Sequence, residues 1–175
     1  RFFTLLLIVC LFIPTQAQAA TYYISPTGND AAAGTSTGTA WKTWGKAFGG
    51  FPSTSCGDTL LVMDGTFTTA THGNATLTKV CTASTIFTVR AINQRVPLIS
   101  GSGLGTSFTV TGSAYITVDG LRIKSVDNAA GNNVGQPMYI SSSNHIVAKN
   151  LLLYENNSYF NTQILNVSAS NNVLV

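Results

Sequence analysis

The sequence predicts an all-β chain that folds as a right-handed parallel β-helix, with a short capping α-helix near its N-terminus. A pattern of short apolar strands recurs, and Ser113, Ser143 and Ser170 hold equivalent positions 30 and 27 residues apart. A two-residue corner ends in Gly120 in one copy and in Asn150 in the next. Periods of roughly 20 to 50 residues are typical of repeat architectures, so both observations favour a solenoid.

Each full copy of the repeat contains three short strands. Side chains alternate along a strand, so Ile116 and Val118 are expected inside and Thr117 outside. The abrupt corner needs a left-handed residue, and we expect a positive φ at the glycine and the asparagine. An antiparallel β-sandwich also has short strands, but it does not naturally repeat this corner. The predicted strands are 108–110, 116–118 and 121–123, then 138–140, 146–148 and 151–153.

The region before the repeat predicts one helix among further strands. Trp41, Trp44 and Phe48 recur at helical spacing, and Gly49 and Pro52 end the pattern. The tryptophans can form a sugar-stacking platform, but helical spacing favours a place in the core. Such a helix suits the open end of a solenoid, which needs a cap. The strands expected here lie at 22–24, at 60–63 before a turn at 64–65, and within 85–92 and 96–101.

Residues 1–19 have the features of a secretory signal peptide. The apolar run FFTLLLIVCLFIP follows Arg1, and Ala17 and Ala19 form an A-x-A cleavage site. A membrane anchor is the alternative, but the run is shorter than the roughly 20 residues that a bilayer requires. Val9 before Cys10 disfavours lipoprotein attachment. We therefore expect export to the extracellular space or the periplasm, without a stable membrane anchor.

The ends of the sequence and its composition define the expected organisation. The chain begins without methionine and ends inside a repeat, so we expect a piece of a longer protein. Residues 20–56 form the N-terminal strand, loop and cap helix, and residues 57–175 form the coils. Only 9% of residues are charged and the formal net charge is +3, which argues against nucleic acid as a partner. A monomer is expected.

Two cysteines remain after the leader. Cys56 and Cys81 are 25 residues apart, and an even pair in an exported chain indicates a disulfide. A zinc site or a catalytic thiol is the alternative, but neither has a histidine at suitable spacing. His72 and His145 are expected at the surface, where no third partner completes a ligand set or a triad.

Two segments carry a resemblance to a known superfamily. The stretch YYISPTGNDAAAGTSTGTAWKTWGKAF at 22–48 precedes GDTLLVMDGTF at 57–67. Together they resemble the N-terminal region of secreted parallel β-helix proteins of the pectate-lyase-like superfamily. That superfamily includes pectate and alginate lyases, uronate epimerases and glycoside hydrolases. The resemblance therefore implies an architecture and a carbohydrate partner more than one reaction.

The resemblance implies a substrate groove along the first strand of each coil and the long loop that enters it, here KSVDNAAGNNVGQ at 124–136 and YENNSYFNTQ at 154–163. Thr109, Tyr139 and Asn166 are expected to stack outward there, and Lys124 is a candidate to face a sugar carboxylate. A lyase of this kind would neutralise the carboxylate with calcium or a cation, while a base removes the neighbouring proton. The candidate substrate-binding residues are Lys124, Asp127, Tyr139, Glu155 and Asn166, of which Asp127 and Glu155 are also weak calcium candidates.

The leading hypothesis is a secreted lyase of acidic polysaccharide that acts by β-elimination. A non-catalytic glycan-binding or adhesion module is the rival, and a glycoside hydrolase of the same fold is a further alternative. No motif in the sequence assigns a catalytic base. Isolated charges on solenoid loops are also common as plain solvated residues, so the site candidates have a structural alternative.

Overall fold

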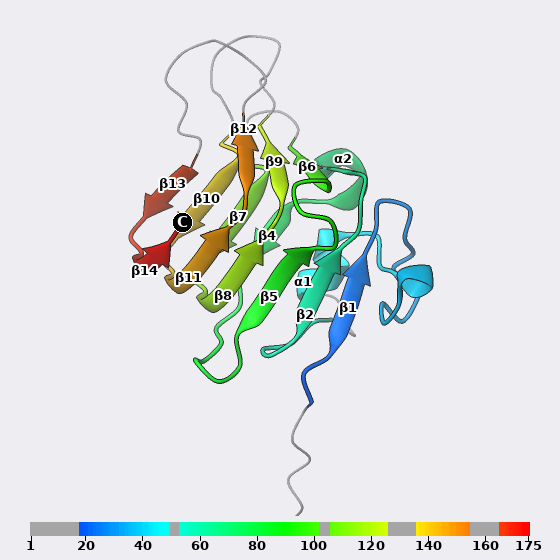
Figure 1. Ribbon diagram of the computed structural model, residues 1–175, viewed down its shortest axis with the longest axis horizontal. Coiled ribbons are helices and arrows are strands. Elements are labelled where there is room, and N and C mark those ends of the chain that lie inside the picture. Colours follow the sequence, from blue (N-terminus) through cyan, green and yellow to red (C-terminus); the bar gives the residue numbers. More distant parts are fainter. Residues whose placement is uncertain (1–17, 50–52, 102–105, 126–135, 155–164) are drawn as a thin grey trace, which may run out of the picture.

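The computed structural model describes residues 18–49, 53–101, 106–125, 136–154 and 165–175. Within them the chain forms three parallel sheets that together build a right-handed parallel β-helix, as the sequence predicts (Figure 1). Each coil contributes one strand to each sheet in the order A, B, C. Each strand therefore pairs in parallel with the equivalent strand of a neighbouring coil, on both sides in the middle of a sheet and on one side at its ends.

The strands are short and their bounds repeat from coil to coil. Sheet A contains β1 (Thr21–Ile24), β2 (Thr59–Val62), β5 (Phe87–Ala91), β8 (Ala114–Asp119), β11 (Asn144–Lys149) and β14 (Asn171–Leu174). Sheet B contains β3 (Thr66–Thr68), β6 (Leu98–Ser100), β9 (Arg122–Lys124) and β12 (Leu152–Tyr154). Sheet C contains β4 (Ala75–Leu77), β7 (Phe108–Thr111), β10 (Met138–Ser141) and β13 (Leu165–Ser168).

The inward residues of successive coils lie directly above one another. Ile116 pairs with Ile146, Val118 with Ala148, and all four are buried. Thr117, between the two inward residues of its strand, is only half-buried. The predicted alternation and register are therefore confirmed, and stacking buries apolar area that a single coil would leave in water.

The predicted corners are also confirmed. Gly120 has a φ of 78° and Asn150 a φ of 54°. Two further left-handed positions, which the sequence analysis did not identify, recur around the starts of β8, β11 and β14, and most of them are not glycine. The first set is Gly112, Ser142 and Ala169, and the second is Tyr115, His145 and Asn172.

A cap covers the N-terminal end of the solenoid, built from a 3₁₀ turn η1 (Thr37–Thr39) and the helix α1 (Trp44–Gly49). Trp44 packs against Phe67 with ring centroids 5.0 Å apart. Trp41 and Trp44 are both buried, which supports the core interpretation over the sugar platform.

The prediction that the helix includes Trp41 is wrong. Trp41 is extended and bridges Ile24 of β1 in parallel, because its backbone N–H donates to Tyr23. Its indole Nε1 donates to the Ala32 carbonyl at 3.0 Å. Pairing with β1 thus outweighs the helical periodicity at this residue, and the helix begins at Trp44.

The prediction that His72 lies at the surface is wrong, whereas His145 is exposed as expected. His72 ends a one-turn helix, α2 (Thr69–His72), and is 4% exposed. Its Nδ1 accepts from the Thr68 N–H at 2.8 Å, so Nε2 donates to the Pro26 carbonyl at 3.1 Å. The imidazole ring therefore links β3 to the N-terminal loop through these two hydrogen bonds.

A disulfide joins the cap to the first coil. Cys56 and Cys81 are bonded, with their Cα atoms 5.4 Å apart, which confirms the predicted pair. No helix in the described ranges is long and apolar enough to span a bilayer.

Candidate functional site

The outward face of sheet C carries a column of polar side chains in coil register. Thr109 pairs with Tyr139, and Tyr139 pairs with Asn166, as the sequence predicts. Thr76 of β4 extends the column by one coil, and the three predicted residues are half-buried. The column thus presents hydroxyl, amide and aromatic groups at the spacing of neighbouring strands, about 4.8 Å.

A second polar column lies two residues further along the same strands. Thr111 pairs with Ser141, which pairs with Ser168. The Ser141 hydroxyl donates to the Thr111 hydroxyl at 2.9 Å. The outward face of sheet C therefore presents uncharged hydrogen-bonding groups over several coils. Such groups can pair with the hydroxyl groups of a sugar chain.

Lys124, the remaining described candidate, lies on a different sheet. It ends β9 of sheet B, where its register neighbours are Ser100 and Tyr154. The same strand begins with Arg122, which the sequence analysis did not select. Arg122 and Lys124 flank the buried Ile123, so both side chains point outward. The available signal was this alternation of a cation, an isoleucine and a second cation.

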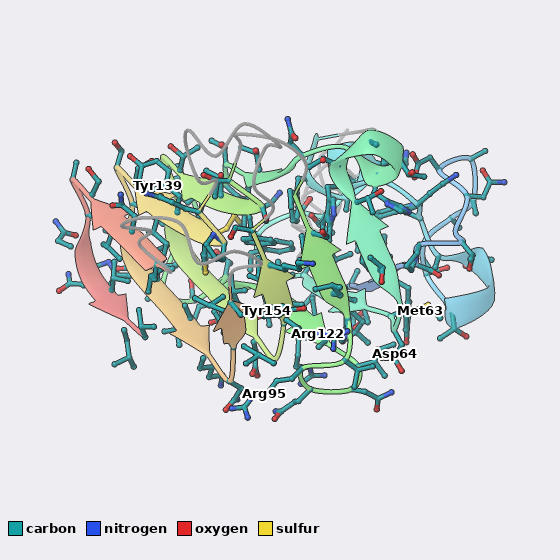
Figure 2. All side chains as sticks on the ribbon, turned by 90° about the horizontal axis from the view of Figure 1, so that it is seen from above. Met63, Asp64, Arg95, Arg122, Tyr139 and Tyr154 are labelled. Atoms are coloured by element: carbon teal, nitrogen blue, oxygen red, sulfur yellow. A yellow bond between two sulfur atoms is a disulfide. The ribbon has the colours of Figure 1, made fainter. Side chains whose placement is uncertain are left out.

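The predicted residues are thus brought together only in part. Tyr139 and Asn166 are neighbours on sheet C, and Figure 2 shows Tyr139 on that sheet, away from Arg122 and Tyr154 on sheet B. Asp127 and Glu155 lie outside the described residues. In the described ranges no three His, Cys, Asp or Glu side chains form a group able to hold a metal ion.

A lysine with a perturbed pKa lies elsewhere, next to the cap. Burial lowers the pKa of the Lys79 ammonium group, and the charge of Asp58 acts in the opposite direction. Lys79 donates to the Thr54 carbonyl at 2.7 Å and lies 5.1 Å from the centre of the Phe87 ring. These contacts attach the cap to the first coils, so Lys79 has a structural role.

Comparison with known proteins identifies the architecture. No family model matches the sequence, and no curated protein matches it. Among solved structures, the crystal structure of pectate lyase Pel9A is similar over 89% of this chain, with a TM-score of 0.60 and 18% identity. A rhamnogalacturonan lyase is similar over 78%, with a TM-score of 0.52 and 15% identity.

These likenesses define the class of fold. The chain has the pectate-lyase-like parallel β-helix architecture, with polar and cationic side chains on its outer faces. It spans 40% of the length of the pectate lyase and 38% of the rhamnogalacturonan lyase. Both neighbours are polysaccharide lyases by name, and at these identities the likeness concerns the fold.

Proposed function

We propose that the protein is a secreted carbohydrate-active β-helix, in the simplest case a lyase that cleaves an acidic polysaccharide by β-elimination. The observation that carries the proposal is the column Thr109, Tyr139 and Asn166, which repeats polar groups over successive coils of sheet C. A ligand with repeating units fits a surface with repeating units. The polysaccharide lyases with the same fold support a polymer of this chemistry.

β-Elimination requires two functions of the protein. Positive charge must stabilise the sugar carboxylate and the negative charge that develops beside it, and a base must remove the neighbouring proton. Lys124 is the candidate for the first function. Calcium is the candidate cofactor, with Asp127 and Glu155 as oxygen ligands of the type that this ion prefers.

A location outside the cytoplasm fits the chemistry of the described residues. The Cys56–Cys81 disulfide is of a kind that persists in oxidising compartments. The signal peptide proposed over residues 1–19 would direct the chain there, so that a monomer meets an extracellular polysaccharide. Neither nucleic acid nor a membrane is proposed as a partner.

A non-catalytic glycan-binding module is the second candidate. The observation in its favour is the regularity of sheet C, whose two outward columns repeat hydroxyl and amide groups from coil to coil. A surface whose polar groups repeat regularly binds a polymer without positioning one glycosidic bond for cleavage.

One assay separates these functions. Full-length protein is incubated with polygalacturonate or alginate, first with calcium and then with a chelator, and the absorbance of unsaturated sugar ends is followed. A calcium-dependent rise is expected for a lyase. New reducing ends without this absorbance would indicate a glycoside hydrolase, and binding without either product would indicate the module. Neither binding nor cleavage of any polysaccharide would refute the proposed function.

A further inference from the structure

The outward face of sheet B around β9 carries two positive charges on one strand, and the register neighbours of the arginine are apolar. Arg122 lies between Leu98 and Leu152 in the register, and Lys124 lies between Ser100 and Tyr154. Two residues along a strand span about 6.6 Å, and neighbouring coils are about 4.8 Å apart. The two cations therefore lie within reach of one small ligand or of adjacent units of a polymer.

Two cations that lie on or beside sheet A are engaged by the protein itself. Lys149 forms an ion pair with Asp119 at 3.7 Å, and the Arg95 Nε donates to the Asn150 carbonyl at 3.2 Å. Arg122 and Lys124 make no side-chain hydrogen bond or ion pair with any described residue, and no acidic side chain lies among the outward positions of sheet B. Within the described residues, no acidic side chain neutralises their charge.

The arginine carries a more specific signal. Its Nε is buried and has no hydrogen-bond partner, one of two such side-chain atoms in the described ranges. A buried donor without a partner is costly. The Nε is shielded from solvent, so an anion at the surface would accept from the two outer nitrogens of the guanidinium. A guanidinium matches a carboxylate in a bidentate fork, whereas an ammonium acts as a point charge.

The neighbours of the two cations suit a sugar ring. Arg122 and Tyr154, labelled in Figure 2, lie on adjacent strands of sheet B, where Tyr154 is the direct register neighbour of Lys124 and the diagonal neighbour of Arg122. Tyr154 offers an aromatic face with a polar tip, and Leu98 and Leu152 offer aliphatic surface. Apolar groups around a cation also lower the local dielectric, which strengthens its attraction for an anion.

We infer that Arg122 and Lys124, with Tyr154 beside them, form an anchoring site for the carboxylate groups of a uronate-containing polysaccharide. The site lies on sheet B and is separate from the polar columns of sheet C. It rests on the proposed function, because it assigns the charge of the polymer and the residues that recognise it. Arg122 holds one carboxylate through its fork, while Lys124 attracts the same or the next carboxylate.

The test measures binding of full-length protein to polygalacturonate and to highly methyl-esterified pectin, which has the same backbone without most of the charge. Arg122→Gln is expected to weaken binding to polygalacturonate about tenfold and Lys124→Gln about threefold. Arg90→Gln is the matched control, since Arg90 is exposed on sheet A, and should change binding less than about twofold. Arg122→Lys should keep part of the affinity, because it retains the charge without the fork.

Two results would overturn the site. One is equal binding of polygalacturonate by wild type, Arg122→Gln and Lys124→Gln, which would leave the proposed function standing. The other is wild-type binding that does not favour polygalacturonate over the esterified pectin. The cleavage assay tests the proposed function separately. If Arg122→Gln has a lowered urea midpoint, Lys124→Gln and Arg122→Lys decide the question.

Discussion

A column of buried serines offers a quantitative test of the coil stacking. Ser143 is 3% exposed at the short connection between β10 and β11. Its hydroxyl accepts from the backbone N–H of Ser113, one coil back, at 3.0 Å and donates to the Ser141 carbonyl at 2.7 Å. Its own backbone N–H donates to the hydroxyl of Ser170, one coil forward, at 3.1 Å.

Ser143→Ala removes one oxygen atom and leaves almost no cavity, so the hydrogen bonds dominate the effect. The Ser141 carbonyl keeps a partner, because it also accepts from the Gly112 N–H at 3.1 Å. The Ser113 N–H loses its acceptor in a buried position. Leaving one such donor unsatisfied costs about 1 to 3 kcal/mol, and we expect the free energy of unfolding to fall by about 2 kcal/mol.

The assay is urea unfolding, followed by far-ultraviolet circular dichroism and by fluorescence of the two buried tryptophans. Ser141→Ala is the matched control, because it removes a half-exposed bond to the Thr111 hydroxyl and leaves both partners near water. That variant should lose less than about 1 kcal/mol. A loss for Ser143→Ala no larger than for the control would refute the idea that the serine column joins the coils.

Two further predictions concern the cap. Burial raises the pKa of Asp30, but hydrogen bonds from Thr43 and Lys42, with the charge of Lys46, outweigh it and hold the pKa below the ordinary 3.8. Asp30→Asn should therefore lower the free energy of unfolding by about 1 kcal/mol at pH 7. In urea titrations the difference in unfolding free energy between wild type and variant should shrink below pH 3.8, as the wild-type carboxylate is protonated. A difference that stays constant with pH would contradict this reasoning. Replacing Cys56 and Cys81 by serine should cost about 3 kcal/mol in the chain-entropy model, and a reductant should then destabilise only the wild type.

The repeat could be predicted because inward positions face the same environment in every coil. Ile116 and Ile146 occupy one buried column, so the period is visible in the sequence. The corners were recognisable because Gly120 and Asn150 are residue types that accept a positive φ. The same conformation at Tyr115 and His145 has no such signature, since the stacking of the two rings, 4.3 Å apart, accompanies it and is visible only in the fold.

The errors have a common cause in contacts made over long sequence distances. Trp41 satisfies a helical period, yet it pairs with β1, 17 residues earlier at Ile24. His72 was expected at the surface because no third partner in the sequence completes a ligand set or a triad with it. Its partner Pro26 is 46 residues away. Local patterns do not contain this information, so only the assembled cap shows it.

The candidate site, too, could be predicted from the sequence only in part. The resemblance, with its groove along the first strand of each coil, was enough to place Tyr139 and Asn166 on an outer face. Lys124 is expected from the sequence in the loop at 124–136, whereas the structure places it at the end of β9. The alternation of Arg122, Ile123 and Lys124 indicates that Arg122 points outward, but it does not single Arg122 out, because an isolated charge at an outward position is ordinary in any sequence. The distinguishing property of Arg122 is a buried Nε that lacks a partner, and this depends on what the neighbouring coils do not supply.

The geometry of the two faces implies different contributions to binding. The columns of sheet C run from coil to coil along the solenoid axis, so they extend with each added coil and suit a long chain of sugars. Arg122 and Lys124 lie along one strand, across that axis, and their equivalents in the neighbouring coils are uncharged. Their contribution does not repeat, so it fixes one charged position of a polymer and adds affinity there. A surface of this design distinguishes a carboxylated polymer from its neutral ester at sheet B, while sheet C follows the part of the chain that both polymers share.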